Sequence, residues 1–258
     1  MRARRLLPSV FGGLVLALVF GPLPAHAQAD AAAVVLAPDD VHGKAGIKCE
    51  GCHSKPGPDQ FAHVPATDVA ALCGQCHVRE ADFYDKSPKR PVFAAIGLPA
   101  CVTCHTNHSI VRPIDAWIGF KEPAVCMKCH IEGSKGDTTI HGLQDGLGQI
   151  SRAVEEADAI LGRAEVAGML VDEGRAKLRS AHEQQILARV AVHAFRPSPL
   201  AEIVTGAVAG AAQAEAVGNQ ALADLRFRRQ GLAVATLLIL GFLITLGIKI
   251  RRLPPVGD

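Results

Sequence analysis

The sequence predicts a mainly α-helical protein in three parts: a small cysteine-rich domain with little regular structure, a long helical hairpin or bundle, and one C-terminal transmembrane helix. All eight Cys of the 258 residues lie between positions 49 and 129. Apolar residues recur at helical spacing after residue 142. An apolar run without charge then covers residues 231–248, long enough to cross a bilayer.

Residues 1–27 have the pattern of a secretory signal peptide. Three Arg within residues 2–5 precede an apolar run at Leu14–Phe20, and Ala25–Ala27 fits a small-residue cleavage site. Two Pro directly after the short apolar run argue against the alternative, an uncleaved N-terminal anchor. We therefore predict that the remainder of the chain is exported.

The next segment, residues 28–141, contains nine Pro, nine Gly and every Cys, with no apolar periodicity long enough for a large helix or a sheet. It also contains a repeat, because the first Cys of each cysteine pair stands at position 49, 73, 101 or 126. A His follows the second Cys of every pair. The four motifs are Cys49-Glu50-Gly51-Cys52-His53, Cys73-Gly74-Gln75-Cys76-His77, Cys101-Val102-Thr103-Cys104-His105 and Cys126-Met127-Lys128-Cys129-His130.

Cys-x-x-Cys-His is the attachment signature of c-type haem, in which two thiols bond to the haem vinyl groups and the His is the proximal iron ligand. Two four-thiolate zinc sites or a disulfide framework are the alternatives. Neither explains a His after every second Cys. The sequence predicts four covalently attached haem c groups, packed within a small domain at residues 28–141.

These motifs, together with the segment Cys104–Ile110, resemble the multihaem c-type cytochromes with doubled CxxCH motifs over residues 42–141. The resemblance implies that His108, three residues after a proximal His, ligates a neighbouring haem. A looser similarity links Val192, His193 and Phe195 to a branch of the group that carries a Val-His-aromatic triplet before a C-terminal anchor.

The remaining histidines supply candidates for the distal iron ligands. Met is nearly excluded, because only Met169 lies outside the initiator position and the motifs, so the inventory favours bis-His haems of low potential. His42 precedes the first motif by seven residues and His63 lies between the first two. We predict four distal ligands, His42, His63, His108 and His193, with His141 and His182 as alternatives.

One position departs from the resembling proteins. After the second motif they often have Ser-x-His, with that His as a distal ligand, whereas this chain has Ser87-Pro88-Lys89. Lys89 would have to ligate as a neutral amine. Otherwise another His takes that place or one haem keeps an open position.

Residues 142–230 form the predicted helical domain. An apolar stripe runs from Ile150 to Val171 in steps of three and four, and Asp172–Gly174 interrupts it. A second helix is expected from about Arg175 to Phe195, and a third from near Leu200 that continues into the membrane segment. The stripe suits a homo-oligomer as well as packing within one chain.

Residues 231–249 are the predicted transmembrane helix and residues 250–258 a cytoplasmic tail. Arg and Lys flank both ends of the span, so the signal peptide decides the orientation. The sequence thus places the protein in the inner membrane by a single-pass C-terminal anchor, with the haem domain in the periplasm.

Charge is nearly balanced, with 27 Lys+Arg against 25 Asp+Glu, which argues against nucleic-acid binding. Four haems with both axial positions filled would pass single electrons rather than bind substrate. The sequence favours a membrane-anchored electron carrier between a quinol-linked membrane enzyme and periplasmic cytochromes or reductases. The alternatives are a quinol dehydrogenase subunit that feeds a periplasmic reductase, and a haem reductase of small oxyanions such as nitrite or hydroxylamine.

Overall fold

The computed structural model describes residues 36–53 and 64–252. The predicted signal peptide, the candidate ligand His63 and the end of the predicted tail lie outside these residues. Within them all regular structure is helical and no strand is present, as the fold class requires.

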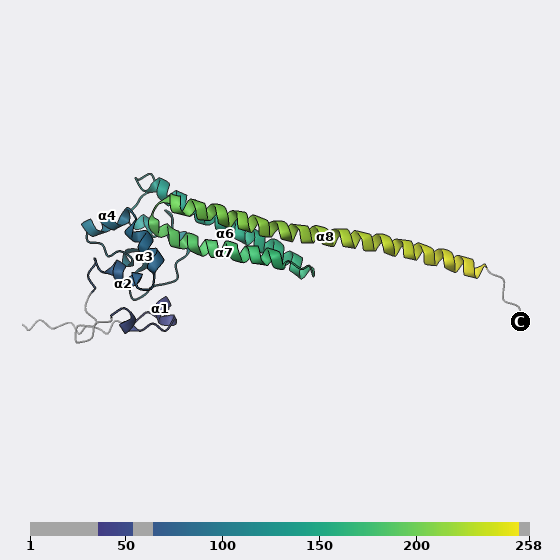
Figure 1. The fold of residues 1–258 in the computed structure, drawn as a ribbon, viewed down its shortest axis with the longest axis horizontal. Helices are drawn as coiled ribbons and strands as arrows, with labels where there is room; N and C mark the ends of the chain where they lie inside the picture. Colours follow the sequence, from purple (N-terminus) through teal and green to yellow (C-terminus); the bar gives the residue numbers. More distant parts are fainter. Residues whose placement is uncertain (1–35, 54–63, 253–258) are drawn as a thin grey trace, which may run out of the picture. The chain divides into compact units, whose positions relative to one another are not determined.

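The cysteine-rich part consists of short helical turns joined by loops (Figure 1). Such short turns bury little surface of their own, so this part depends on contacts between segments that are distant in the sequence. Its elements are α1 (Val41–Lys44), η1 (Cys49–Gly51), α2 (Val69–Gly74), α3 (Val78–Asp85), α4 (Lys89–Ala95), α5 (Val102–His105), η2 (Asp115–Trp117) and η3 (Cys126–Lys128).

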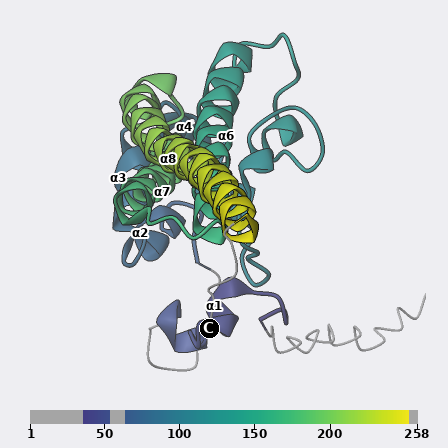
Figure 2. The same ribbon diagram turned by 90° about the vertical axis from the view of Figure 1, so that its right-hand side faces the viewer.

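Three long helices follow: α6 (Asp137–Val166), α7 (Asp172–Ala191) and α8 (Pro197–Arg251), with the 3-10 turn η4 (Val192–Ala194) before α8. They lie side by side in Figure 1 and Figure 2. Gly146 of α6 packs against Leu200 of α8, and further along Gly218 of α8 packs against Ile160 of α6. Helices α6 and α8 are therefore parallel. Helix α7 packs along both of them and runs in the opposite direction.

The predicted apolar stripe forms the core of this bundle. Ile150, Leu161 and Ala164 are fully buried, and they belong to one cluster with residues of the other two helices such as Leu178 and Leu200. Within one chain, α7 and α8 thus cover the face that could also have served self-association.

The boundaries of the helices differ from expectation at the α6–α7 turn. Helix α6 ends at Val166, and Gly168 has a φ of +80°, a conformation that glycine adopts without strain. Asp172 and Glu173 are not an interruption of the stripe but the first turn of α7, where the helix dipole favours acidic side chains. The second helix therefore starts earlier than predicted and its regular part ends at Ala191.

Helix α8 begins with Pro197 in its first turn, a position that tolerates the missing N–H. It continues without interruption through 55 residues, including the apolar run at 231–248. Beyond the bundle α8 extends alone (Figure 1), and its most apolar window has a mean hydropathy of 2.5 and no buried residue. By length and composition α8 is a candidate membrane anchor.

Candidate haem-binding site

The four cysteine motifs adopt the same local conformation. In each one, the backbone N–H of the motif His donates to the carbonyl of the first Cys, four residues earlier, at 2.8–3.0 Å. The N–H of the second Cys donates to the same carbonyl at 3.1–3.3 Å. A single helical turn places residues three and four apart on one side, so both thiols and the imidazole of a motif face one way. All eight thiols are free of disulfides.

Consecutive motifs are neighbours in space. A hydrogen bond joins the thiols of Cys73 and Cys101, which lowers the pKa of Cys73 to about 7 and raises that of Cys101. Burial and then the charges of Cys73 and Cys76 raise the pKa of Cys52. The second motif therefore lies near both the first and the third.

The fourth motif lies near the third. The pKa of Cys104 is raised by burial and then by the nearby Cys126. These thiols would become thioethers once haem is attached, so the pKa shifts indicate only that consecutive motifs lie near one another. A haem attached to each motif would thus lie near the haem of the next motif along the chain.

Three of the four motif histidines face a second histidine from elsewhere in the chain. The ring centroids of His53 and His108 are 6.1 Å apart, and the two ring planes are nearly parallel, at 17°. His42 and His77 are separated by 6.0 Å, edge to face. In the third pair, the ring centroid of His193 lies 6.0 Å from that of His105, again with nearly parallel planes. Three of the predicted distal ligands therefore lie opposite a motif histidine.

These separations fit a metal between the rings. Metal–imidazole nitrogen bonds measure ~2 Å, and the centre of the ring lies about 1 Å farther from the metal. Two imidazoles on opposite sides of one metal therefore have centroids roughly 6 Å apart, whereas directly stacked rings approach to about 4.5 Å. The residues present thus fit an iron with two axial histidines at three motifs.

Asp40 positions two of these histidines, a role that the sequence analysis missed. Its carboxylate is fully buried. Oδ1 accepts the backbone N–H of His42 and of Gly43, both at 2.9 Å, at the start of α1, and Oδ2 accepts that of Ile110 at 2.7 Å. Burial raises the pKa of Asp40, but the three donors outweigh it and hold that pKa below its ordinary value. Asp40 thereby joins the His42 turn to the segment of His108.

His193 is held in one orientation at the turn between α7 and α8. Its Nδ1 lies 2.9 Å from the carbonyl oxygen of Val190, which can only accept, so the proton is on Nδ1 and Nε2 is left to bind a metal. Facing it, His105 is largely buried, and burial followed by the charge of His193 lowers the pKa of His105. Burial of His105 therefore favours the neutral form of that imidazole, which metal binding needs.

A polar network attaches the helical bundle to the cysteine-rich part beside this pair. Arg189 of α7 donates from Nε to Asp115 Oδ1 at 2.7 Å and from Nη2 to Oδ2 at 3.0 Å. Ser151 of α6 donates to the same carboxylate, and Gln185 donates to Ser151. Asp115 starts η2, which ends at Trp117, whose ring lies 5.5 Å from that of His105. The network thus joins the C-terminal part of α7, which directly precedes the turn of His193, to the segment that packs on His105.

The fourth motif histidine has a different neighbour. Nε2 of His130 lies 2.7 Å from Nζ of Lys89, at the start of α4. The pKa of His130 is lowered by burial and then by the charge of Lys89. The residue that stands in place of the expected Ser-x-His ligand thus lies against a motif histidine.

The alternative distal ligands, His141 and His182, have other surroundings. His141 Nε2 is 3.4 Å from Asp137 Oδ1 and 3.6 Å from Glu132 Oε1, and its ring packs on Phe120. His182 lies on the exposed side of α7. The remaining candidate, His63, is outside the described residues, and the structure does not place it.

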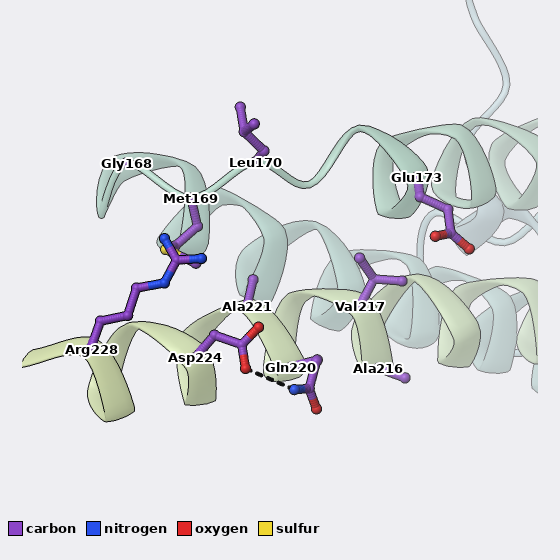
Figure 3. A pocket seen from close by; sticks show the side chains of 10 residues that line it. All are labelled: Gly168, Met169, Leu170, Glu173, Ala216, Val217, Gln220, Ala221, Asp224 and Arg228. Atoms are coloured by element: carbon purple, nitrogen blue, oxygen red, sulfur yellow. Dashed lines mark hydrogen bonds between the residues drawn. The ribbon is translucent and has the colours of Figure 1, made fainter. Parts of the chain in front are cut away.

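A hollow is present at the other end of the bundle, between the α6–α7 turn and α8 (Figure 3). It is lined by Met169, Glu173 and Arg228 among others and contains no motif residue. Beside it, Val166 and Leu170 are 92% and 88% exposed, so the tip of the hairpin presents apolar side chains. This end lies next to the last turns of α8 before its apolar run.

Comparison with known proteins gives one match to a family. Neither the curated proteins nor the solved structures give a match. Residues 41–131 match the model of the cytochrome c3 family, and this range contains all four motifs as well as His42, Lys89 and His108. Together with the paired histidines, the match supports a multihaem c-type cytochrome that transfers electrons.

Proposed function

We propose that the protein is a membrane-anchored periplasmic tetrahaem cytochrome that passes single electrons between a quinol-linked membrane enzyme and periplasmic redox partners. Each haem, when bound, supplies a one-electron iron couple. The motif cysteines attach four haems, and His53, His77, His105 and His130 are their proximal ligands. The distal histidines are His108 for the first motif, His42 for the second and His193 for the third.

The observation that carries the proposal is the pairing of motif histidines with second nitrogen donors. A filled coordination sphere leaves no position for a substrate, which favours electron transfer over reduction of nitrite or hydroxylamine. The closeness of consecutive motifs would provide a path along which electrons can move. The burial of His105 and the hydrogen bond between His193 Nδ1 and the Val190 carbonyl would keep this pair of ligands in place during a change of iron charge.

Anchoring in a membrane is supported by two features. The apolar part of α8 is exposed along its whole length and would be unstable in water. The hairpin tip places the exposed Leu170 beside the last turns of α8 before that apolar part, where it would meet the bilayer surface (Figure 3). The predicted signal peptide supports export of the haem domain.

The length of α8 argues against direct oxidation of quinol by this chain. His193 lies just before α8, and 34 residues of helix separate Pro197 from Gly231, or ~50 Å at 1.5 Å per residue. Even a tilt of about 40° leaves a rise of roughly 40 Å. The haem beside His193 would thus lie too far from the bilayer for direct transfer from a quinol, which favours a protein donor.

The experiment uses the full chain in lipid nanodiscs. We expect four haems per chain by pyridine haemochrome analysis, and uptake of four electrons in a redox titration. Quinol in the nanodisc alone should reduce the protein very slowly, whereas a soluble one-electron donor should reduce it at once. A chain with fewer than four haems would overturn the haem assignment, and rapid reduction by quinol would support the quinol dehydrogenase alternative instead.

Membrane topology has a separate test. Protease added to intact spheroplasts should remove the haem domain and leave a membrane-bound α8 fragment. Protection of the haem domain until the membrane is broken would contradict export.

A further inference from the structure

The fourth motif has a nitrogen donor of a different chemical kind. At the other three motifs an imidazole faces the motif histidine, whereas at His130 the amine of Lys89 lies 2.7 Å from Nε2. The two residues are 41 positions apart in the sequence. The folding of the chain, rather than local sequence, therefore brings this amine to the nitrogen that would bind iron.

Several contacts direct Lys89 toward His130. Ser87 is buried and its Oγ accepts the backbone N–H of Lys89 at 3.2 Å, which fixes the first turn of α4. The rings of Phe93 and Phe195 each have their centre 5.9 Å from Nζ. These two neighbouring aromatic rings restrict the positions open to the end of the side chain.

The position of the His130 ring is also defined. A Cβ at Gly136 would lie 2.8 Å from His130 Nδ1 and 3.0 Å from Cε1, closer than real Cβ contacts allow. Glycine at this position therefore allows the ring to approach the start of α6 with Nε2 pointing toward Lys89. The site is built by residues from three separate segments of the chain.

We propose that Lys89 is the distal ligand of the haem attached at Cys126 and Cys129, opposite His130. This inference rests on the proposed tetrahaem function. Two metal–nitrogen bonds of ~2 Å need a nitrogen–nitrogen separation of about 4 Å, so Nζ must move back by a little over 1 Å. The four-carbon stem of lysine permits this movement by rotation. On binding, the nitrogen lone pair forms the bond to iron and the ammonium proton passes to water.

The consequence is that the haems are not equivalent. Three have two imidazole ligands, and the fourth has an imidazole and an amine. A haem with a distinct ligand can differ in potential from its neighbours, because axial ligand identity sets the potential. Ligation by Lys89 would therefore make the potential of the fourth haem differ from that of the three bis-histidine haems, and this difference would favour electron flow one way between them.

The test compares the purified full-length protein with three variants. Lys89→Ala should convert one of the four haems from low spin to high spin and bind about one carbon monoxide per chain. Lys89→His should keep four low-spin haems and bind none, but lose the electron paramagnetic resonance signal of an imidazole–amine haem. Lys86→Ala is the matched control, because Lys86 is exposed and pairs with Asp82. It should behave like the wild type.

The outcomes separate this inference from the proposed function. Four low-spin haems in Lys89→Ala, or one carbon monoxide bound per wild-type chain, would overturn ligation by Lys89 while leaving the tetrahaem function intact. A wild-type chain with fewer than four haems would overturn the proposed function itself. If Lys89→Ala does not accumulate, Lys89→His decides alone, and a spectrum identical to the wild type contradicts the proposal.

Discussion

The guanidinium of Arg189 donates hydrogen bonds to both carboxylate oxygens of Asp115, from Nε at 2.7 Å and from Nη2 at 3.0 Å. The two residues are 74 positions apart, one on α7 and the other at the start of η2. This contact ties the helical bundle to the segment that packs on His105. It is partly exposed, so its contribution comes from two-point geometry more than from charge alone.

We predict that Arg189→Lys lowers the free energy of unfolding by about 1 kcal/mol, because a lysine cannot donate to both oxygens. The haem at His105 should show a broadened low-spin signal, since η2 and α7 are no longer held together. Asp115→Asn should have a similar effect. The double variant should cost little more than either single one, and full additivity in chemical denaturation would show that the two residues act independently.

A second prediction concerns His193. Its replacement by Ala should leave the haem of the third motif five-coordinate, so that one haem of four becomes high spin and binds carbon monoxide. His182→Ala is the matched control, because His182 lies on the exposed side of α7, the helix that directly precedes the η4 turn of His193. Absorption and paramagnetic resonance spectra measure both. Four unchanged low-spin haems in His193→Ala would refute its role as a ligand.

A third prediction tests Asp40, whose carboxylate accepts three backbone N–H groups while fully buried. In Asp40→Asn the amide nitrogen cannot accept, so at least one donor loses its partner. We expect a loss of about 2 kcal/mol in unfolding free energy and weaker ligation by His42 and His108. The exposed neighbour Asp39→Asn should have no such effect, and equal stabilities of the two variants would contradict the prediction.

A fourth prediction compares two glycines of α8. Gly206 has no atom within 4 Å of a Cβ, so Gly206→Ala should stabilise the helix by about 1 kcal/mol. At Gly218 a Cβ would lie 2.6 Å from Ile160 Cγ2, so Gly218→Ala should cost roughly 1–2 kcal/mol despite the gain in helix propensity. Thermal unfolding followed by circular dichroism should show changes of opposite sign, and a shared sign would exclude the packing of α6 on α8 described above.

The sequence predicted the parts of the fold that depend on local patterns. The stripe through Ile150 and Leu161 was visible because a helix repeats its buried face every three or four residues. The end of the first long helix was predicted less accurately: the stripe was expected to continue to Val171, whereas the helix ends at Val166, before Gly168. A Gly within an apolar stripe can belong to a helix or end it. The acidic pair Asp172 and Glu173 indicates a helix start when read with that glycine.

The pairing of ligands was not accessible in the same way. Each cysteine motif is local, but the partner of His105 is 88 positions later, and only the packing of α7 brings His193 there. Asp40 left a signal, because an Asp directly before a short helical segment is a typical N-cap. No pattern in the sequence indicated that Asp115 and Arg189 would meet.

The uninterrupted course of α8 has a consequence for how the protein finds its partners. With its apolar end in a bilayer, a single helix without a loop confines the haem domain to a limited range of distances from the membrane surface. The search for a partner then becomes two-dimensional. A donor or acceptor whose redox centre stands at the same height meets this domain at a raised effective concentration, while one that is shorter does not meet it at all.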